Sequence, residues 1–419
     1  MRCEISRIHA REILDSRGNP TIEVEVETSS GVHGLAAVPS GASKGKAEAL
    51  ELRDGGKRYH GLGVRKAINS VKIIEAKLLG IDVRRQKEID EVMIELDGKE
   101  NKSKLGANAI LGISLACARA GALSNKQELF EYIGGLEANM IPIPFFNIIN
   151  GGKHAGNKLD FQEFMIVPID FQDFKEAVRT GSEVYHALKG MLIKEYGRSS
   201  INVGDEGGFA PPFENPKEAL DMVMKAINEM GYERSVKIAL DIAASNFYDG
   251  KGNYIIAGET WSKEKLSNYY LELVEEYPII SLEDPFYEED FEGFKELTEK
   301  LDIQIVGDDL FVTNIRRLKK GIEKKAGNAL ILKVNQIGTL TEALETGRLA
   351  MRNGYKVQTS HRSGETEDTF ISDLAVAIRC GQIKSGAPCR GERTAKYNRL
   401  IRIEELLGER AQYPKNFFN

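Results

Sequence analysis

Six residues with reactive side chains each lie at the end of a short segment in the second half of the chain. Most of these segments are apolar runs with the length and composition of buried strands. When such strands alternate with helices, their carboxyl ends gather at one face of a barrel, where active sites form. The six residues expected to meet there are Asp241, Glu283, Asp308, Lys333, His361 and Lys384.

Lys333 is the candidate general base. It ends an apolar run at 329–332 and is followed by the turn-forming Gly338. An ammonium group at the edge of a dry core loses hydration, which predicts a pKa below the ordinary value of about 10.4. A lysine with a lowered pKa accepts protons in catalysis. The alternative is that Lys333 simply extends to solvent at the strand end.

Three carboxylates among the six predict a metal site. Asp241, Glu283 and Asp308 offer hard oxygen ligands, with no cysteine and no paired histidines beside them. Such a set selects Mg²⁺, which keeps open positions for water and substrate oxygens. The alternative is that each caps a helix or lies in solvent. Their occurrence in consecutive strand–helix units favours the metal, and Lys384 adds a cation against a substrate carboxylate or enolate.

Glycine-rich loops carry further candidates. Glu206 lies among three glycines at 203–209, where the backbone can approach a ligand closely, so Glu206 is a candidate general acid; a plain turn is the alternative. The loops at 150–157, with His154, and 39–45, with Ser43, are suited to act as mobile lids. Arg362 and Ser363 follow another strand and fit a phosphate. The alternative there is a surface pair between Arg362 and Glu365.

The elements that must position these residues fall into two groups. Residues 20–40 alternate as strands of a hairpin or meander, and 63–78, 83–96 and 106–122 have helical periodicity, which indicates an α+β domain. Strand patterns at 236–241, 279–283, 303–308, 329–333 and 355–360 alternate with stretches long enough for helices, which indicates parallel βαβ units and a (β/α) barrel. A domain boundary is expected near Gly134 and Gly135, giving domains 1–135 and 136–419.

The composition indicates which class of ligand to expect and in which cellular compartment the protein lies. The 419 residues carry a net charge of −6 and no basic block, which argues against nucleic acid and favours a small or metal-bridged ligand. Four cysteines without CxxC spacing are expected to be reduced thiols in a cytoplasmic protein. The first residues are charged where a signal peptide would be apolar, and no apolar run is long enough for a membrane span, so a soluble protein is expected.

The chain closely resembles the enolase family over its whole length. The shared motifs include Ser-Arg-Gly-Asn-Pro-Thr at 16–21, Val-Gly-Asp-Glu-Gly-Gly-Phe-Ala-Pro at 203–211 and Leu-Lys-Val-Asn-Gln-Ile-Gly-Thr-Leu-Thr at 332–341. Others lie at 150–157, 161–164, 283–285, 306–309, 360–368, 381–388 and 391–398. The resemblance implies an α/β protein with a small N-terminal α+β domain and a C-terminal (β/α)8-like TIM-type barrel whose early strands are atypical.

The resemblance also implies a reaction, the Mg²⁺-dependent, reversible dehydration of 2-phospho-D-glycerate to phosphoenolpyruvate through a metal-stabilised enolate. Lys333 would remove the carbon 2 proton, and Glu206 would protonate the departing hydroxyl. Two Mg²⁺ ions are implied, the first held by the three carboxylates and the second through Ser43. Lys384 would bind the carboxylate, and Arg362 and Ser363 the phosphate. The pocket would further be lined by the catalytic Glu163 and His361 and by the substrate-binding His154 and Gln162.

Other functions stay open. A related acid–sugar or amino-acid lyase would share the metal carboxylates, but Arg362, Ser363 and the Lys333/Glu206 pair favour a phosphorylated substrate. A protein with the family fold but altered catalysis and a binding or surface role would lack at least one catalytic group, and all are present. The resemblance implies a homo-oligomer, dimer or octamer. One departure from the family is Asn246, where a glutamate is common.

Overall fold

The computed structural model describes residues 3–42, 45–415 and 417–418. The N-terminal part pairs three strands antiparallel in the order β1-β2-β3, and four helices follow. The strands are β1 (Ile5–Leu14), β2 (Pro20–Thr28) and β3 (His33–Ala37). The helices are α1 (Arg65–Leu78), α2 (Gln86–Asp97), α3 (Ala107–Ser124) and α4 (Leu129–Gly134). An α+β N-terminal domain is therefore confirmed.

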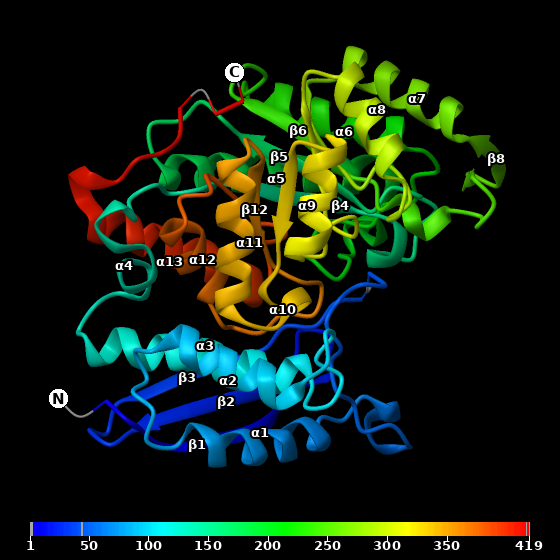
Figure 1. Ribbon diagram of the computed structural model, residues 1–419. Helices are drawn as coiled ribbons and strands as arrows, with labels where there is room; N and C mark the ends of the chain where they lie inside the picture. The colour runs from blue at the N-terminus through cyan, green and yellow to red at the C-terminus, as the bar shows by residue number, and fades with distance from the viewer. Residues whose placement is uncertain (1–2, 43–44, 416, 419) are drawn as a thin grey trace.

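Helix α3 is apolar on all sides because it lies between the N-terminal sheet and the barrel (Figure 1). Among the described residues, it is the one helix long and apolar enough to cross a membrane, yet 89% of its residues are buried within the protein. A core helix covered on both sides needs no polar face. The composition of α3 is thus explained by its packing.

The C-terminal part is a closed barrel of eight strands in the order β10-β11-β12-β13-β4-β5-β6-β9. The strands, in chain order, are β4 (Ile143–Asn150), β5 (Glu163–Pro168), β6 (Val236–Asp241), β9 (Ile279–Glu283), β10 (Gln304–Gly307), β11 (Ala329–Leu332), β12 (Lys356–Ser360) and β13 (Gln382–Lys384). Strand β5 runs antiparallel to both neighbours, β4 and β6, and the other pairs are parallel. The expected barrel with atypical early strands is confirmed.

Helices surround the barrel (Figure 1). They are α5 (Phe174–Tyr196), α6 (Pro216–Glu229), α7 (Lys263–Glu276), α8 (Phe291–Lys300), α9 (Ile315–Lys324), α10 (Val334–Ile337), α11 (Leu340–Arg352), α12 (Phe370–Ala377) and α13 (Gly391–Leu407). A small hairpin of β7 (Asn253–Ile256) and β8 (Glu259–Ser262) is inserted between β6 and α7. Capping side chains begin several of these helices; Asp173, for example, accepts a hydrogen bond from the backbone N–H of Glu176 at the start of α5.

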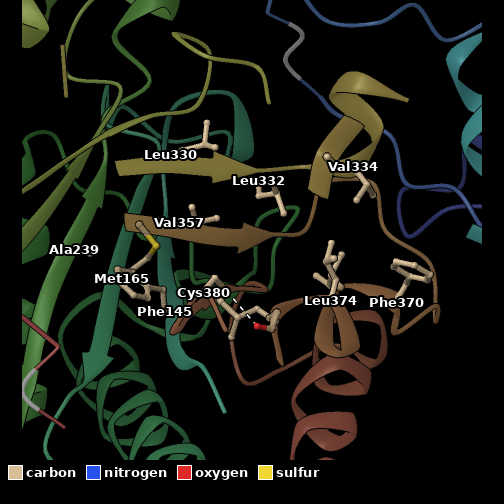
Figure 2. Packing of buried hydrophobic residues seen from close by; sticks show 14 of the residues in the cluster. Phe145, Met165, Ala239, Leu330, Leu332, Val334, Val357, Phe370, Leu374 and Cys380 are labelled. Atoms are coloured by element: carbon tan, nitrogen blue, oxygen red, sulfur yellow. Dashed lines mark hydrogen bonds between the residues drawn. The ribbon is translucent and has the colours of Figure 1, made fainter. Parts of the chain in front are cut away.

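The core is built from apolar residues of the strands and the helices that cover them. In one region, Leu330 and Leu332 of β11, Val357 of β12 and Leu374 of α12 gather together, with Phe145 of β4 nearby (Figure 2). These side chains are almost completely excluded from solvent. Burial of this kind contributes roughly 25 cal/mol per Å² of apolar surface and makes the barrel a rigid support for the residues at its mouth.

The N-terminal domain covers the mouth of the barrel. Ser40, in the loop after β3, exchanges two backbone hydrogen bonds with Gly364, in the loop after β12, at 2.8 and 2.9 Å. At the start of α11, the backbone N–H of Leu340 donates to Ser114 of α3, and that of Thr341 donates to Asp90 of α2. The strand ends therefore lie in an enclosed space between the two domains.

The structure contains strands that the periodicity did not indicate. Strand β1 was not expected, because its sequence alternates poorly and its burial is irregular. Strands β4 and β5 are buried along their whole length, so they show no alternation that would mark them. The elements expected from 236 onward are found within a few residues of their expected bounds. The division at 135/136 stays a prediction.

Candidate active site

The structure brings the six strand-end residues together. Asp241, Glu283 and Lys384 are the last residues of β6, β9 and β13, and Asp308, Lys333 and His361 directly follow β10, β11 and β12. A cavity of about 20 Å³ is lined by all of these except Glu283. Its lining comprises Gly41, Ala42, His154, Gln162, Glu163, Glu206, Asp241, Asp308, Lys333, Ser360, His361, Arg362, Ser363 and Lys384. Ser43 lies outside the described residues.

Lys384 is buried among three carboxylates. Its Nζ lies 2.8 Å from Glu283, 3.1 Å from Glu163 and 3.2 Å from Asp241. Burial acts to lower the pKa of Lys384, but the three carboxylates outweigh it and hold the pKa well above its ordinary value. Lys384 is therefore a fixed positive charge at the centre of the site.

Lys333 forms an ion pair with Asp308, and its side chain is 12% exposed. It does not extend to solvent. Burial acts to lower the pKa of Lys333, but the Asp308 carboxylate outweighs burial and raises the pKa above its ordinary value. The expectation of a lowered pKa is therefore wrong for this arrangement, since a strand end alone says nothing of the carboxylate that faces the lysine.

The backbone of Lys333 is held by neighbouring elements. Its N–H donates to Thr313 Oγ1 at 2.9 Å, and Thr313 Oγ1 donates to Gln336 Oε1 at 2.9 Å. Gln336 Nε2 in turn donates to Asp308 Oδ1 at 2.8 Å. This chain of hydrogen bonds orients Asp308 as well as Lys333, so the ion pair is built into the loops after β10 and β11.

The donor set fits Mg²⁺. Asp241, Glu283 and Asp308 present carboxylate oxygens, and among the described residues Glu283 Oε1 is buried without a hydrogen-bond partner. Burial and the neighbouring Asp241 raise the pKa of Glu283 well above its ordinary value, and the opposing effect of Lys384 does not compensate. A hard divalent cation would satisfy these oxygens.

Asp284 lies beside this set but has a structural role. Its oxygens accept hydrogen bonds from the backbone N–H groups of Asp308 and Asp309, at 3.0 and 2.7 Å. Asp284, Asp308 and Asp309 present oxygens within 4.8 Å of one another. Burial and the Asp308 charge raise the pKa of Asp309 to about 7. The three side chains concentrate negative charge behind the site.

His154, Glu163 and Glu206 form a second cluster of titratable side chains in the site. His154 Nδ1 lies 3.4 Å from Glu163 and 3.5 Å from Glu206. Burial and the Glu206 charge raise the pKa of Glu163 to about 7. Burial also acts to raise the pKa of Glu206, but the polar contact with His361 and the charges of His154 and Arg393 hold it well below its ordinary value. Of the two glutamates, Glu163 therefore holds a proton more readily than Glu206.

The loop around Glu206 depends on its glycines. A Cβ on Gly204 would lie 2.4 Å from the carbonyl oxygen of His154, and Gly207 has φ +86°. Glycine is therefore required at Gly204 because a side chain would clash there, and at Gly207 because other residues are strained at this φ. Glu206 itself is 2% exposed and accepts a hydrogen bond from Asn147 Nδ2 at 3.0 Å. The loop is thus part of the site and not a plain surface turn.

Arg362 and Ser363 lie at the edge of the cavity nearest the N-terminal domain. Both Nη atoms of Arg362 donate to Glu48, at 3.0 and 3.2 Å. Ser363 Oγ accepts the backbone N–H of Ala42 at 2.6 Å. The alternative of a surface pair between Arg362 and Glu365 is wrong, because Arg362 is 5% exposed and its guanidinium group pairs with Glu48. Glu365 accepts the backbone N–H of Arg362 and pairs with Lys396.

Several residues of the site were missed at the level of the sequence. Asn335 and Gln336 lie shortly after Lys333, on α10, and Asn335 Oδ1 accepts from Arg362 at 3.2 Å. Glu48 follows the glycine-rich loop at 39–45, and only the fold brings it to Arg362. Gln162 was expected here, and its Nε2 donates to Asp241 at 3.2 Å while its Oε1 accepts from Asn246 at 3.3 Å. Asn246 thus contacts the site through Gln162.

Comparisons with known proteins agree over the full chain. Residues 5–133 match the enolase N-terminal domain family, and residues 138–419 match the enolase C-terminal TIM barrel domain family. The chain is 60% identical over 417 residues to an enolase of Methanocaldococcus jannaschii. The aligned region covers 99% of this chain and 98% of that enolase. It is 59% identical over 423 residues to an enolase of Thermococcus kodakarensis, with 99% and 98% covered. It is 58% identical over 416 residues to an enolase of Pyrococcus furiosus, with 98% and 96% covered. The chain therefore belongs to the enolase family.

Proposed function

We propose that this protein is a carbon–oxygen lyase that reversibly dehydrates 2-phospho-D-glycerate to phosphoenolpyruvate, as a phosphopyruvate hydratase. The observation that carries the proposal is the convergence of Lys333, Lys384 and the site carboxylates on one buried cavity, in a chain 60% identical to an enolase. Proton removal next to a carboxylate needs a base, an acid for the leaving hydroxyl and concentrated positive charge. The residues of this site can supply all three.

Lys333 is the proposed base for the proton on carbon 2. It must be neutral to accept that proton, yet Asp308 keeps the ammonium group charged in this arrangement. Asp308 therefore has to be engaged elsewhere when the base acts. Bound Mg²⁺, held by Asp241, Glu283 and Asp308, would supply the positive charge that draws electron density onto the substrate carboxylate. A second Mg²⁺, held through Ser43, belongs to the same proposal.

Glu206 is the proposed acid for the hydroxyl on carbon 3. In the hydration direction its low pKa keeps Glu206 ionised, which is the form that can accept a proton from the attacking water. In the dehydration direction it must first hold a proton, and Glu163, with a pKa of about 7, is a suitable reservoir. The oxygens of both glutamates lie within 4.8 Å of one another, with His154 between them. Proton exchange within this group supports catalysis in both directions.

Binding of the substrate is assigned to positively charged and polar groups around the cavity. Lys384 would bind the substrate carboxylate, Arg362 and Ser363 the phosphate, and Gln162 and His361 would line the pocket. A cavity of about 20 Å³ has room for roughly one water molecule. Binding of the substrate therefore requires Arg362 to release Glu48 and bind the phosphate instead. It also requires the loop at 39–42 to move away from Ser363.

The proposal extends to assembly and location. Family membership supports a homo-oligomer, a dimer or an octamer, and a cytoplasmic location with the substrate as the main small-molecule partner. Light scattering of the purified protein would distinguish dimer from octamer, and cell fractionation would test the location and any presence at the cell surface.

The direct test is a spectroscopic assay. Purified protein with 2-phospho-D-glycerate and Mg²⁺ should give a steady rise in ultraviolet absorbance as phosphoenolpyruvate forms, and chelation of the metal should stop it. Protein that is folded and metal-loaded but gives no rise would refute the proposed reaction.

A further inference from the structure

Arg393 is a fully buried cation behind the proposed acid. It is the third residue of α13 and is 0% exposed. The first turn of a helix is the end that favours negative charge, so a cation there is electrostatically unfavourable. The nearest acidic group in an ion pair with Arg393 is Glu392, with 3.6 Å between Oε1 and Arg393 Nε. Burial of this charge is costly, and its hydrogen bonds must compensate.

The guanidinium group of Arg393 connects two loops of the site. Nη2 donates to the carbonyl oxygens of Ser363, at 2.6 Å, and Asp205, at 3.0 Å. Nη1 donates to the carbonyl oxygen of Arg362 at 2.6 Å. Asp205 precedes the proposed acid Glu206, and Arg362 and Ser363 are the proposed phosphate ligands. One side chain therefore sets the distance between the acid and the phosphate groups.

The remaining contact of Arg393 determines the tautomer of His361. Arg393 Nη1 lies 2.6 Å from His361 Nδ1. A guanidinium group is only a donor and does not lose its proton in proteins, so Nδ1 must be the acceptor. In a neutral imidazole the other nitrogen then carries the hydrogen. His361 Nε2 lies 3.2 Å from Glu206 Oε2, although it is not aligned as a regular hydrogen bond.

Protonation of His361 is opposed by its surroundings. A second N–H at Nδ1 would point at the N–H of Arg393. Burial, and then the charges of Arg393 and Lys384, lower the pKa of His361 to about 3, and the opposing effect of Glu206 does not compensate. His361 therefore stays neutral, with its N–H on Nε2, the ring nitrogen that lies 3.2 Å from Glu206.

We propose that Arg393 is a positioning residue for the reaction, which holds His361 as the Nε2–H tautomer and so presents a hydrogen-bond donor to Glu206. The opposite tautomer would direct a lone pair at the Glu206 carboxylate and repel it. This inference rests on the proposed function for its catalytic consequence, but the tautomer itself is a property of the protein without substrate.

The tautomer is tested by nitrogen-15 NMR of the wild-type protein at neutral pH. The chain has six histidines, and the His361 signals are assigned by their loss in His361→Asn. We expect an unprotonated Nδ1 and a protonated Nε2. An Nδ1–H tautomer or an imidazolium would overturn the proposal, whether or not the protein is active.

The catalytic consequence is tested with Arg393→Met. We expect dehydration of 2-phospho-D-glycerate to slow on the order of 100-fold, since a positioned acid contributes at least that much. Exchange of the carbon 2 proton with solvent, which depends on Lys333, should stay close to wild type. A general loosening of the site would instead slow both, and that result, or unchanged dehydration, would overturn the proposal.

Arg399→Met is the matched control. Arg399 lies on the same helix and pairs with Asp373 and Glu128, away from the cavity. Its loss should lower the melting temperature without slowing dehydration relative to proton exchange. If Arg393→Met does not fold, Arg393→Lys, which keeps the charge, replaces it and should show the same selective slowing to a smaller degree. If the wild-type protein does not dehydrate the substrate, the proposed function fails. The NMR result would still show whether His361 is the Nε2–H tautomer that the contact with Arg393 requires.

Discussion

At the scale of single residues, positive and negative groups in the site neutralise each other in pairs. Lys384 is shared by Asp241, Glu283 and Glu163, and Lys333 is paired with Asp308. Such buried pairs are stable only while each charge keeps its partner. A ligand that brings its own charges therefore has to reorganise the pairs, and this reorganisation can convert Lys333 from a bound ammonium into a base.

Substitution of Lys333 separates the two proton transfers. In Lys333→Ala, exchange of the carbon 2 proton with solvent should fall by at least about 100-fold. Lys384, the other amine in the described cavity lining, is held as a charged ammonium by three carboxylates and cannot accept the proton. In Glu206→Gln, the same exchange should persist while dehydration slows by a similar factor. Proton exchange is followed by NMR in deuterated water, and dehydration by absorbance. Normal exchange in Lys333→Ala would contradict the assignment of the base.

At the scale of elements, the loop after β12 is fixed to the N-terminal domain. Arg119 of α3 donates two hydrogen bonds to Asp368, at 2.6 and 2.7 Å. Asp368 also accepts the backbone N–H groups of Ala37 and Phe370. The same loop carries His361, Arg362 and Ser363. The pair therefore joins the loop that carries the proposed phosphate ligands to the sheet and helix of the other domain.

Asp368→Asn should destabilise the protein by about 3 kcal/mol at neutral pH, because it leaves a largely buried guanidinium group without its partner charge. Burial acts to raise the pKa of Asp368, but Arg119 and the backbone donors lower it below the ordinary value. The contribution of the pair is thus complete above about pH 3.9 and is lost as the pH falls through the lower folded pKa. Urea unfolding should show the difference between the two proteins shrinking below that pH.

The control is the exposed pair Lys158–Glu214, whose side chains are 76% and 64% exposed. Glu214→Gln should leave the free energy of unfolding unchanged, since surface pairs are screened by water and salt. If Asp368→Asn and Glu214→Gln changed the free energy of unfolding equally, the buried pair would contribute no more to stability than the exposed pair.

At the scale of the whole molecule, stability and ligand binding are coupled because the barrel ends in an excess of buried carboxylates. Burial raises the pKa of Glu283 and Asp284 well above their ordinary values, and neighbouring carboxylates add to the effect. The folded protein therefore carries repulsion that the unfolded chain does not. A cation bound only to the folded state would relieve it.

Mg²⁺ should raise the melting temperature of the protein, and chelation should reverse the rise. At a concentration 100 times the dissociation constant, the expected gain is about 2.7 kcal/mol. Glu283→Gln should reduce the Mg²⁺-dependent shift while raising the stability of the metal-free protein, because it removes a buried charge. Glu296→Gln, an exposed change on α8 with the same loss of charge, is the control and should keep the full shift. An undiminished shift in Glu283→Gln would remove Glu283 from the proposed metal ligands.

The sequence by itself determined the strand-end residues and the barrel that gathers them. Asp241, Glu283, Asp308 and Lys333 each end a short strand or directly follow one, and local patterns are enough to locate such strands. Lys384 was placed with them only as the reactive residue after the next helix. A glycine-rich loop added Glu206, another strand end added Arg362 and Ser363, and the family motifs added Glu163 and Gln162. These conclusions depend on residues close together in the chain.

Only the tertiary structure decided what each of these groups faces. Asp308 raises the pKa of Lys333, which was expected to be lowered. Glu48 accepts hydrogen bonds from Arg362, and Arg393 sets the tautomer of His361. The partners in the last two pairs are separated by 314 and 32 residues, respectively. The protonation state of a buried group depends on charges and donors within a few ångströms, and no local pattern records which distant residues the fold brings there. Strand β5 is a similar case, since its antiparallel direction is set by its neighbours in the closed barrel.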